Sequence, residues 1–343
     1  MKERIVILSG KNSEKLAKQI AKICGYELGK IEWREFADRE YKPVIKTNVR
    51  KADVYIINST NAPDRNFNEV MLIQDATMRA SAKSITFVCP YFGGERQERK
   101  DEPRTCITAA ANAKRINDSK ISKFVVMDLH ADAIQGFFDM PVDHIFASTL
   151  FVPDLVKRDL KNAVFASPDA GGVKRVEKYG NYFGCPIAVF FKGRLSSEPN
   201  AVQQMVFLGD VKRKHVIFVD DMFDSLGTIE SAEKLIQNEE VLSITAYGTH
   251  PVFSSKAYER MKKLSNIEFV VTDTIPIPRR FRKLPNLRVI SVAELLAKVI
   301  ERDVEGESIS ELYVFKNWYI PKDLKEVGFY WPLLFWLFFY SAW

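Results

Sequence analysis

The sequence predicts an α/β protein of two domains, each a parallel sheet flanked by helices. Three observations lead to this prediction. The chain has 343 residues, 46% of them hydrophobic, which is enough for two packed cores. Short apolar runs rich in β-branched residues alternate with amphipathic segments over most of the chain. The runs are continuously apolar, as is typical of strands buried on both faces.

In chain order, the apolar runs predict strands at residues 5–8, 54–57, 85–88, 124–127, 164–166, 188–191, 216–219, 244–247 and 269–271. Amphipathic spacing predicts helices at 14–24, 68–81 and 228–237. Because the alternation restarts near residue 150, we expect one domain over 1–148 and another over 149–304, with 305–320 packing back on the first. Ligands of parallel sheets bind outside the carboxyl ends of the strands, so residues that follow each run are candidates for a site.

Composition narrows the classes of partner. The formal net charge of +6 is spread along the chain, which fits small anionic substrates such as phosphates and predicts no nucleic-acid binding. The apolar run at residues 5–8 is too short for a signal peptide. The cysteines form no CxxC pair and have no histidine at metal-ligand spacing, so we expect reduced thiols in a cytoplasmic protein. They are Cys24, Cys89, Cys106 and Cys185.

Residues 321–343 form an atypical apolar tail, which is almost wholly apolar and aromatic from Phe329 to Trp343 and is broken by Pro332. A helix that spans a membrane needs about 20 apolar residues, so we expect no membrane association. Three explanations of the tail stay open: a docked hydrophobic segment, an oligomer contact, or a sequence artefact such as a shifted reading frame.

The strongest local signal follows the apolar run at 216–219. Two carboxylates, Asp220 and Asp221, end this run, and a short loop at 224–228 leads into a predicted helix. Backbone N–H groups and hydroxyls at the start of a helix are suited to bind phosphate. Carboxylates repel phosphate, so these two are better suited to accept hydrogen bonds from ribose hydroxyls. The alternative is an ordinary strand-to-helix turn with an aspartate N-cap.

Polar residues follow three further predicted strands. His130 follows the fourth, and its imidazole can ligate a divalent metal or donate to a phosphate oxygen. Asp169 follows the fifth and precedes a glycine pair, so it can hold Mg²⁺ where backbone approaches a ligand closely. Residues 91–100 follow the third, and their clustered arginines suit a polyphosphate. Taken singly, a structural histidine, a turn and a solvated charge run explain the same residues.

The segment at 216–228 resembles the phosphoribosyl-diphosphate binding signature of phosphoribosyltransferases and of ribose-phosphate diphosphokinases. The other segments resemble the diphosphokinases, and the resemblance runs from about Leu8 to Tyr313. It implies two similar phosphoribosyltransferase-type domains. It also implies transfer of the β,γ-diphosphate of Mg-ATP to the C1 hydroxyl of ribose 5-phosphate, with AMP as the leaving group. The segments are 36–40, 91–100, 127–143, 166–172 and 190–194.

The resemblance implies roles for individual residues. It implies that Lys192 and Arg194 are catalytic and that His130 and Asp169 bind the metal, Mg²⁺. The residues for ATP are Phe36, Asp38, Arg39, Glu40, Arg96, Gln97, Arg99 and His130. Those for ribose 5-phosphate are Arg194, Asp220, Asp221, Asp224, Ser225, Leu226, Gly227 and Thr228. Several positions depart from the family pattern: among them, Arg39 replaces a glycine, Gly193 a charged residue and Leu226 a small residue.

The resemblance also implies an assembly. Residues 190–194 resemble the start of the family's mobile catalytic loop, and 36–40 resemble a segment that often reaches ATP from a neighbouring subunit. The implied assembly is a homo-oligomer built from dimers, commonly a hexamer, with activation by phosphate and inhibition by ADP. The residues that match the regulatory pocket are Arg50, Arg79, Ser81, Ser308 and Ser310.

Two other functions stay open at the level of sequence. A phosphoribosyltransferase shares the loop at 220–228 but gives no reason for the segments around His130, Arg96 and Lys192. A non-catalytic regulatory homologue that tunes an active partner fits the departures at residues 39, 193 and 226. The retained cations at 192 and 194 favour an enzyme.

Overall fold

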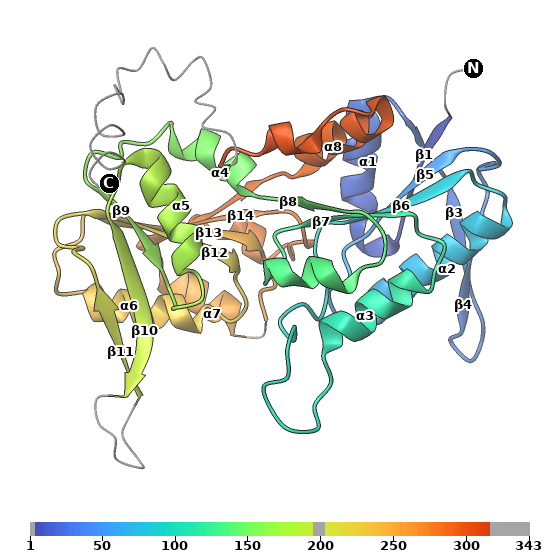
Figure 1. The fold of residues 1–343 in the computed structure, drawn as a ribbon. Helices are drawn as coiled ribbons and strands as arrows, with labels where there is room; N and C mark the ends of the chain where they lie inside the picture. Colours follow the sequence, from blue (N-terminus) through green and yellow to red (C-terminus); the bar gives the residue numbers. More distant parts are fainter. Residues whose placement is uncertain (1–3, 195–202, 255, 316–343) are drawn as a thin grey trace, which may run out of the picture.

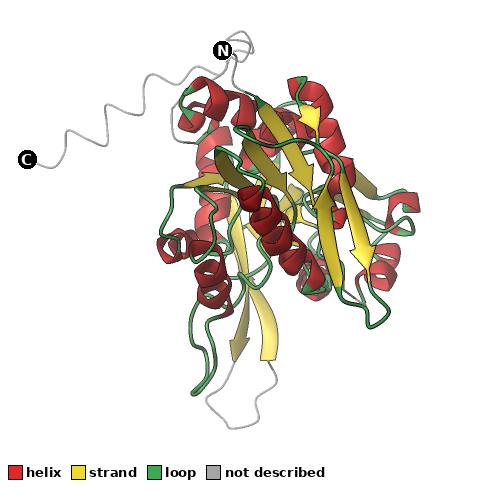
Figure 2. Ribbon diagram, turned by 90° about the vertical axis from the view of Figure 1, so that its right-hand side faces the viewer, coloured by secondary structure: helices red, strands yellow, loops and turns green. Residues whose placement is uncertain are grey.

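The computed structural model describes residues 4–194, 203–254 and 256–315. In that part of the chain two mainly parallel sheets carry helices on both faces, which confirms the predicted α/β class (Figures 1 and 2). The apolar tail at 321–343 lies outside the described residues. None of the described helices has the length and apolar character needed to cross a membrane.

Residues 5–145 build the first sheet and an adjoining hairpin. The strands are β1 (Ile5–Ser9), β2 (Glu27–Leu28), β3 (Ile31–Glu35), β4 (Tyr41–Ile45), β5 (Asp53–Ile57), β6 (Ser84–Cys89), β7 (Lys123–Met127) and β8 (Val142–Ile145). The helices are α1 (Glu14–Cys24), α2 (Arg65–Arg79) and α3 (Thr108–Asn117). The sheet has the order β2-β1-β5-β6-β7-β8 with parallel pairs, while β3 and β4 form an antiparallel hairpin. α1 covers one face and α2 with α3 the other.

Residues 163–290 build the second sheet. Its strands are β9 (Ala163–Ser167), β10 (Ile187–Arg194), β11 (Gln203–Leu208), β12 (His215–Met222), β13 (Ser243–His250), β14 (Ile267–Thr272) and β15 (Leu287–Ile290). Its helices are α4 (Ser148–Leu155), α5 (Val173–Phe183), α6 (Gly227–Ile236) and α7 (Ala257–Lys263). The order is β11-β10-β9-β12-β13-β14-β15, with only β10 and β11 antiparallel among the described pairs. α4 and α5 cover one face, and α6 and α7 the other.

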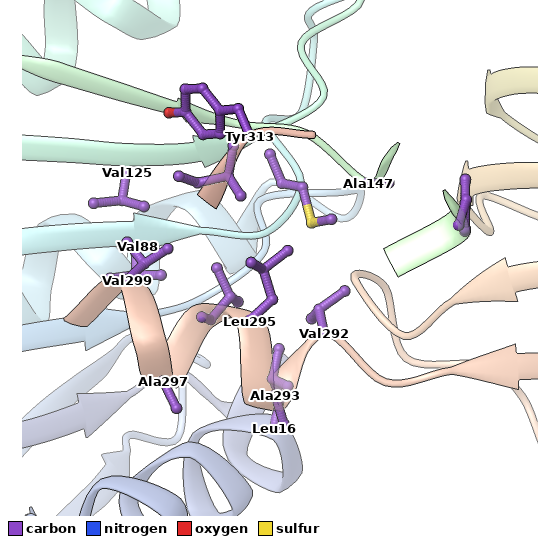
Figure 3. Packing of buried hydrophobic residues seen from close by; sticks show 14 of the residues in the cluster. Leu16, Val88, Val125, Ala147, Val292, Ala293, Leu295, Ala297, Val299 and Tyr313 are labelled. Carbon is purple, nitrogen blue, oxygen red and sulfur yellow. The ribbon is translucent and has the colours of Figure 1, made fainter. Parts of the chain in front are cut away.

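Helix α8 (Ala293–Glu305) follows the second sheet but packs on the first. Leu295 and Val299 of this helix share a buried cluster with Val88 of β6 and Val125 of β7 (Figure 3). Tyr313, near the end of the described chain, joins the same cluster. The cluster continues to α4 and α5, so the two sheets share one apolar core.

The nine predicted strands and three predicted helices are all present, with ends within three residues of those predicted. Unpredicted strands such as β2, β3, β8 and β15 are short or half-exposed, so no continuous apolar run marks them. One expectation was wrong. Residues 192–194, expected in a loop, extend β10, because Lys192 pairs with Met205 and Arg194 with Gln203 of β11.

The carboxyl ends of the two sheets face each other. The Ser59 hydroxyl, beyond β5, donates to the Thr274 carbonyl oxygen, beyond β14, at 2.5 Å. The Thr249 hydroxyl of β13 donates to Asp128 Oδ2, beyond β7, at 2.5 Å. These bonds bring residues that follow strands of both sheets to one place, where a ligand of parallel sheets binds.

Candidate active site

The loop after β12 leaves four backbone N–H groups free. Leu226 is in the left-handed conformation (φ 60°), and α6 begins at Gly227 without a side-chain cap, so the predicted alternative of an aspartate N-cap is wrong. Within the described ranges, the N–H groups of residues 225–228 donate to no acceptor. Unbonded N–H groups at a helix N-terminus attract anions, so this loop is suited to bind a phosphate.

His130 reaches this loop from the other sheet. It follows β7, and its Nδ1 lies 2.7 Å from Asp221 Oδ2 at the end of β12. The hydrogen bond to Asp221 raises the pKa of His130 above its usual value, although burial opposes this. Nε2 has no bond to any described residue, which leaves it open to a metal or a phosphate. The contact unites the two halves of the predicted site.

Arg175, in the first turn of α5, is a site residue that the sequence analysis missed. Its Nη1 lies 3.1 Å from Asp220 Oδ1 and 3.3 Å from Asp221 Oδ1. Burial disfavours the Arg175 cation, but the two carboxylates outweigh burial and raise its pKa. The only sequence feature that could have indicated Arg175 is its position shortly after the predicted glycine pair. A cation at such a position is equally typical of an exposed helix surface.

The two neighbouring carboxylates of β12 differ in their affinity for a proton. Burial raises the pKa of Asp220 well above its usual value, and the charge of Asp221 adds to this. Burial acts the same way on Asp221, but the hydrogen bond with His130 and the charge of Arg175 lower its pKa below the usual range. The contacts with His130 and Arg175 therefore favour the ionised form of Asp221.

The segment after β6 brings one predicted cation to the loop. Arg96 Nη1 lies 2.7 Å from Asp224 Oδ2. Gln97 instead accepts a hydrogen bond from the Thr108 hydroxyl of α3. Arg99 is 83% exposed and lies 3.5 Å from Glu98 Oε1. Of the three residues predicted here to bind ATP, only Arg96 contacts the loop at 224–228 in the described structure.

Glu95 is a second site residue that the sequence analysis missed. It is fully buried, its Oε2 accepts a hydrogen bond from the His130 N–H at 3.3 Å, and its Oε1 has no partner among the described residues. Burial, reinforced by the charge of Asp221, raises its pKa well above the usual range. In the sequence nothing separates this buried acid from the charge run beside it.

Asp169 lies between β9 and α5. Its Oδ1 accepts a hydrogen bond from the Gly172 N–H at 3.0 Å, and its charge contributes to the raised pKa of Asp220. No three metal-ligating side chains of the described residues come together. A cation bound by His130 or Asp169 would therefore take its remaining ligands from water and substrate phosphates, as Mg²⁺ does. Asp221 holds Nδ1 of His130 in the way carboxylates orient histidine ligands of metals.

Residues 36–40 connect the strands of the β3–β4 hairpin, which lies at the right-hand edge of the molecule in Figure 1, away from β12. Phe36 is 49% exposed, and Asp38 Oδ1 accepts a hydrogen bond from the Glu40 N–H at 3.0 Å. Arg39 has φ 71°, a conformation that glycine adopts without strain. Within one chain, these four predicted ATP residues are not brought to His130.

The two predicted catalytic cations, Lys192 and Arg194, occupy the last residues of β10. Their side chains lie outside the described part of the chain, as does the polar stretch at 195–200 that follows them. Their backbone belongs to the strand beside β9, and β9 leads into the loop of Asp169.

Comparison with known proteins gives a consistent result. A family model for the N-terminal domain of ribose phosphate pyrophosphokinase matches residues 5–119. A model for the phosphoribosyl synthetase-associated domain matches residues 196–315.

Curated relatives and a solved structure match nearly the whole chain. The ribose-phosphate pyrophosphokinase of Porphyromonas gingivalis is 40% identical over 310 residues, which are 90% of this chain and 97% of the relative. That of Campylobacter jejuni is 40% identical over 90% of this chain and 98% of the relative. The crystal structure of phosphoribosylpyrophosphate synthetase from Mycobacterium smegmatis aligns with a TM-score of 0.82 at 32% identity, covering 89% of this chain and 100% of that one.

Proposed function

The chain belongs to the ribose-phosphate pyrophosphokinase family, and on that premise we propose how its residues carry out the reaction of that family. The enzyme transfers the β,γ-diphosphate of ATP to the C1 hydroxyl of ribose 5-phosphate, giving 5-phosphoribosyl 1-diphosphate and AMP. The observation that carries the proposal is the 2.7 Å contact between His130 and Asp221. It supports a single site in which the nucleotide side and the sugar side meet.

Ribose 5-phosphate binds at the loop between β12 and α6. The free N–H groups of residues 225–228, with the Ser225 and Thr228 hydroxyls, hold the 5-phosphate. Asp220 and Asp221 hydrogen-bond the ring hydroxyls. Arg175 offsets the repulsion between these acids and the phosphate. The unbonded state of the four N–H groups supports this assignment.

ATP binds between this loop and the segment after β6. Arg96 exchanges Asp224 for polyphosphate oxygens, and Gln97 and Arg99 complete the phosphate contacts from the same segment. The hairpin tip of a neighbouring copy supplies residues 36–40, with Phe36 stacked on the base. The exposure of Phe36, and the position of the β3–β4 hairpin away from β12 (Figure 1), support a contribution in trans.

His130 Nε2 and the Asp169 carboxylate would hold a Mg²⁺ ion, whose other ligands would be substrate oxygens. When bound, the ion neutralises charge on the transferring diphosphate. Lys192 and Arg194 close on the same group from β10 and stabilise the charge that spreads over it in the transition state. The C1 hydroxyl attacks the β-phosphorus in line with the AMP oxygen that leaves. The protein contributes by positioning the two substrates and by neutralising charge.

The test is release of AMP from ATP by the purified protein, with and without ribose 5-phosphate and Mg²⁺. We expect AMP and 5-phosphoribosyl 1-diphosphate in equal amounts only when all three are present. A phosphoribosyltransferase would release no AMP from ATP. A regulatory homologue would bind ligands and release none alone, so either outcome refutes the assigned activity.

We propose that the active form is a homo-oligomer built from dimers, as a hexamer, and light scattering by the purified protein tests this mass. Phosphate activates it and ADP inhibits it at a pocket formed by Arg50, Arg79, Ser81, Ser308 and Ser310. The 2.9 Å contact between the Ser308 and Ser310 hydroxyls supports a shared polar surface at that place.

The unpaired state of all four cysteines supports a cytoplasmic location.

A further inference from the structure

The geometry points to Arg260 as a positioning residue for the phosphate loop, an inference that rests on the proposed binding of ribose 5-phosphate at residues 224–228. Arg260 lies on α7, outside every group assigned to a substrate or metal. Its Nη1 donates to the Ser225 carbonyl oxygen at 2.8 Å, and its Nε donates to Glu230 Oε2 of α6 at 2.8 Å. One side chain of α7 therefore connects the loop with the helix α6 that follows it.

The carbonyl groups of three successive residues, 223–225, are held by α7 and by the segment that leads into it. The N–H groups of residues 253 and 254 donate to the carbonyl oxygens of residues 223 and 224, at 2.9 and 3.2 Å. Arg260 completes the series at Ser225. The C=O and N–H groups of one trans peptide point in opposite directions. Holding the Ser225 carbonyl therefore turns the Leu226 N–H to the side where a phosphate binds.

Arg260 acts on the loop by orienting the Ser225–Leu226 peptide more than by adding positive charge. A Cβ atom at Gly227 would lie 3.2 Å from Arg260 Nη1, so the guanidinium rests against the first residue of α6. Glu230 offsets its charge. The left-handed backbone of Leu226 is costly for a branched residue, and Arg260 holds the adjoining peptide in place before a ligand arrives.

The test is Arg260→Gln in the full-length enzyme, assayed for both substrates. Losing a charge-assisted hydrogen bond should raise KM for ribose 5-phosphate about tenfold. The kcat and the KM for Mg-ATP should change by less than about twofold. The substitution weakens binding of ribose 5-phosphate equally in the ground state and the transition state, and it removes no contact made only in the transition state. Arg260→Lys keeps the charge but cannot donate in two fixed directions, so most of the increase in KM should remain.

Lys234→Gln is the matched control, since Lys234 Nζ contacts the same Glu230 carboxylate at 3.3 Å and does not contact the loop. It should leave both KM values unchanged. Calorimetric titration with ribose 5-phosphate, with circular dichroism to verify folding, checks each variant. If Arg260→Gln does not fold, Arg260→Lys and Glu230→Gln carry the test, and unchanged KM for the sugar in both overturns the inference.

A parallel fall in kcat and rise in both KM values would mark Arg260 as a merely structural residue and would also overturn it. The proposed function fails separately, if the wild-type enzyme does not bind ribose 5-phosphate at all. If the wild type binds and the Arg260 variants bind equally well, only the positioning role is lost.

Discussion

His250, at the end of β13, links stability to pH at the junction of the two sheets. It is fully buried, with Nε2 3.2 Å from the Asp128 carbonyl oxygen and Nδ1 3.0 Å from the Thr274 hydroxyl. A neutral ring satisfies both contacts, since Nε2–H donates to the carbonyl and Nδ1 accepts from the hydroxyl. Burial lowers the pKa of His250 from 6.5 to about 4.

The free energy of unfolding falls as the pH falls, because the unfolded chain takes up a proton at His250 more readily than the folded chain. Below pH 6.5 the unfolded chain protonates this histidine, while the folded chain resists protonation until about pH 4. The stability that His250 contributes is therefore complete above pH 6.5 and is lost as the pH falls toward 4. At about 1.4 kcal/mol per unit of pKa difference, roughly 2 kcal/mol is lost between pH 8 and pH 5.

The measurement is urea unfolding of the wild type and of His250→Gln at pH 8 and pH 5, followed by circular dichroism. Gln keeps a donor near the Asp128 carbonyl but has no proton to gain. The wild type should be more stable at pH 8, and its advantage should shrink by about 2 kcal/mol at pH 5. Because other titrating groups act equally in both proteins, the difference isolates His250. An advantage that is the same at both pH values would refute the reasoning.

Three further predictions concern the site. Asp221→Asn removes the carboxylate charge that holds His130 and should lower activity or Mg²⁺ affinity about 10–100-fold, measured by metal titration of AMP release; an unchanged metal dependence would contradict the orienting role of this carboxylate. Lys192→Ala should lower kcat about 10²–10³-fold with little change in either KM, measured by steady-state kinetics, and turnover like the wild type would remove Lys192 from the mechanism. Arg39→Gly should stabilise the protein by about 1 kcal/mol, because φ 71° strains arginine, and a lowered melting temperature would show that the side chain contributes more than the strain costs.

The sequence predicted several residues of the candidate site but not which of them would be in contact. His130, Asp169 and Asp221 each follow a continuous apolar run, and that position alone marks a ligand-binding edge in parallel sheets. Arg175 and Glu95 follow no run directly, and their charges resemble those of an exposed helix or loop. Their burial depends on how the chain packs around them, which no local pattern records.

The sequence by itself determined the α/β class, the central strands, and the residue types that end them, because hydrophobic periodicity and turn chemistry are local properties of the chain. Only the tertiary structure decided which strand ends meet. His130 and Asp221 are separated by 91 positions, and Arg96 and Asp224 by 128, yet both pairs are in contact. Such contacts depend on strand order and on the packing of α8 against the first sheet, which are set by burial of a core shared between distant segments.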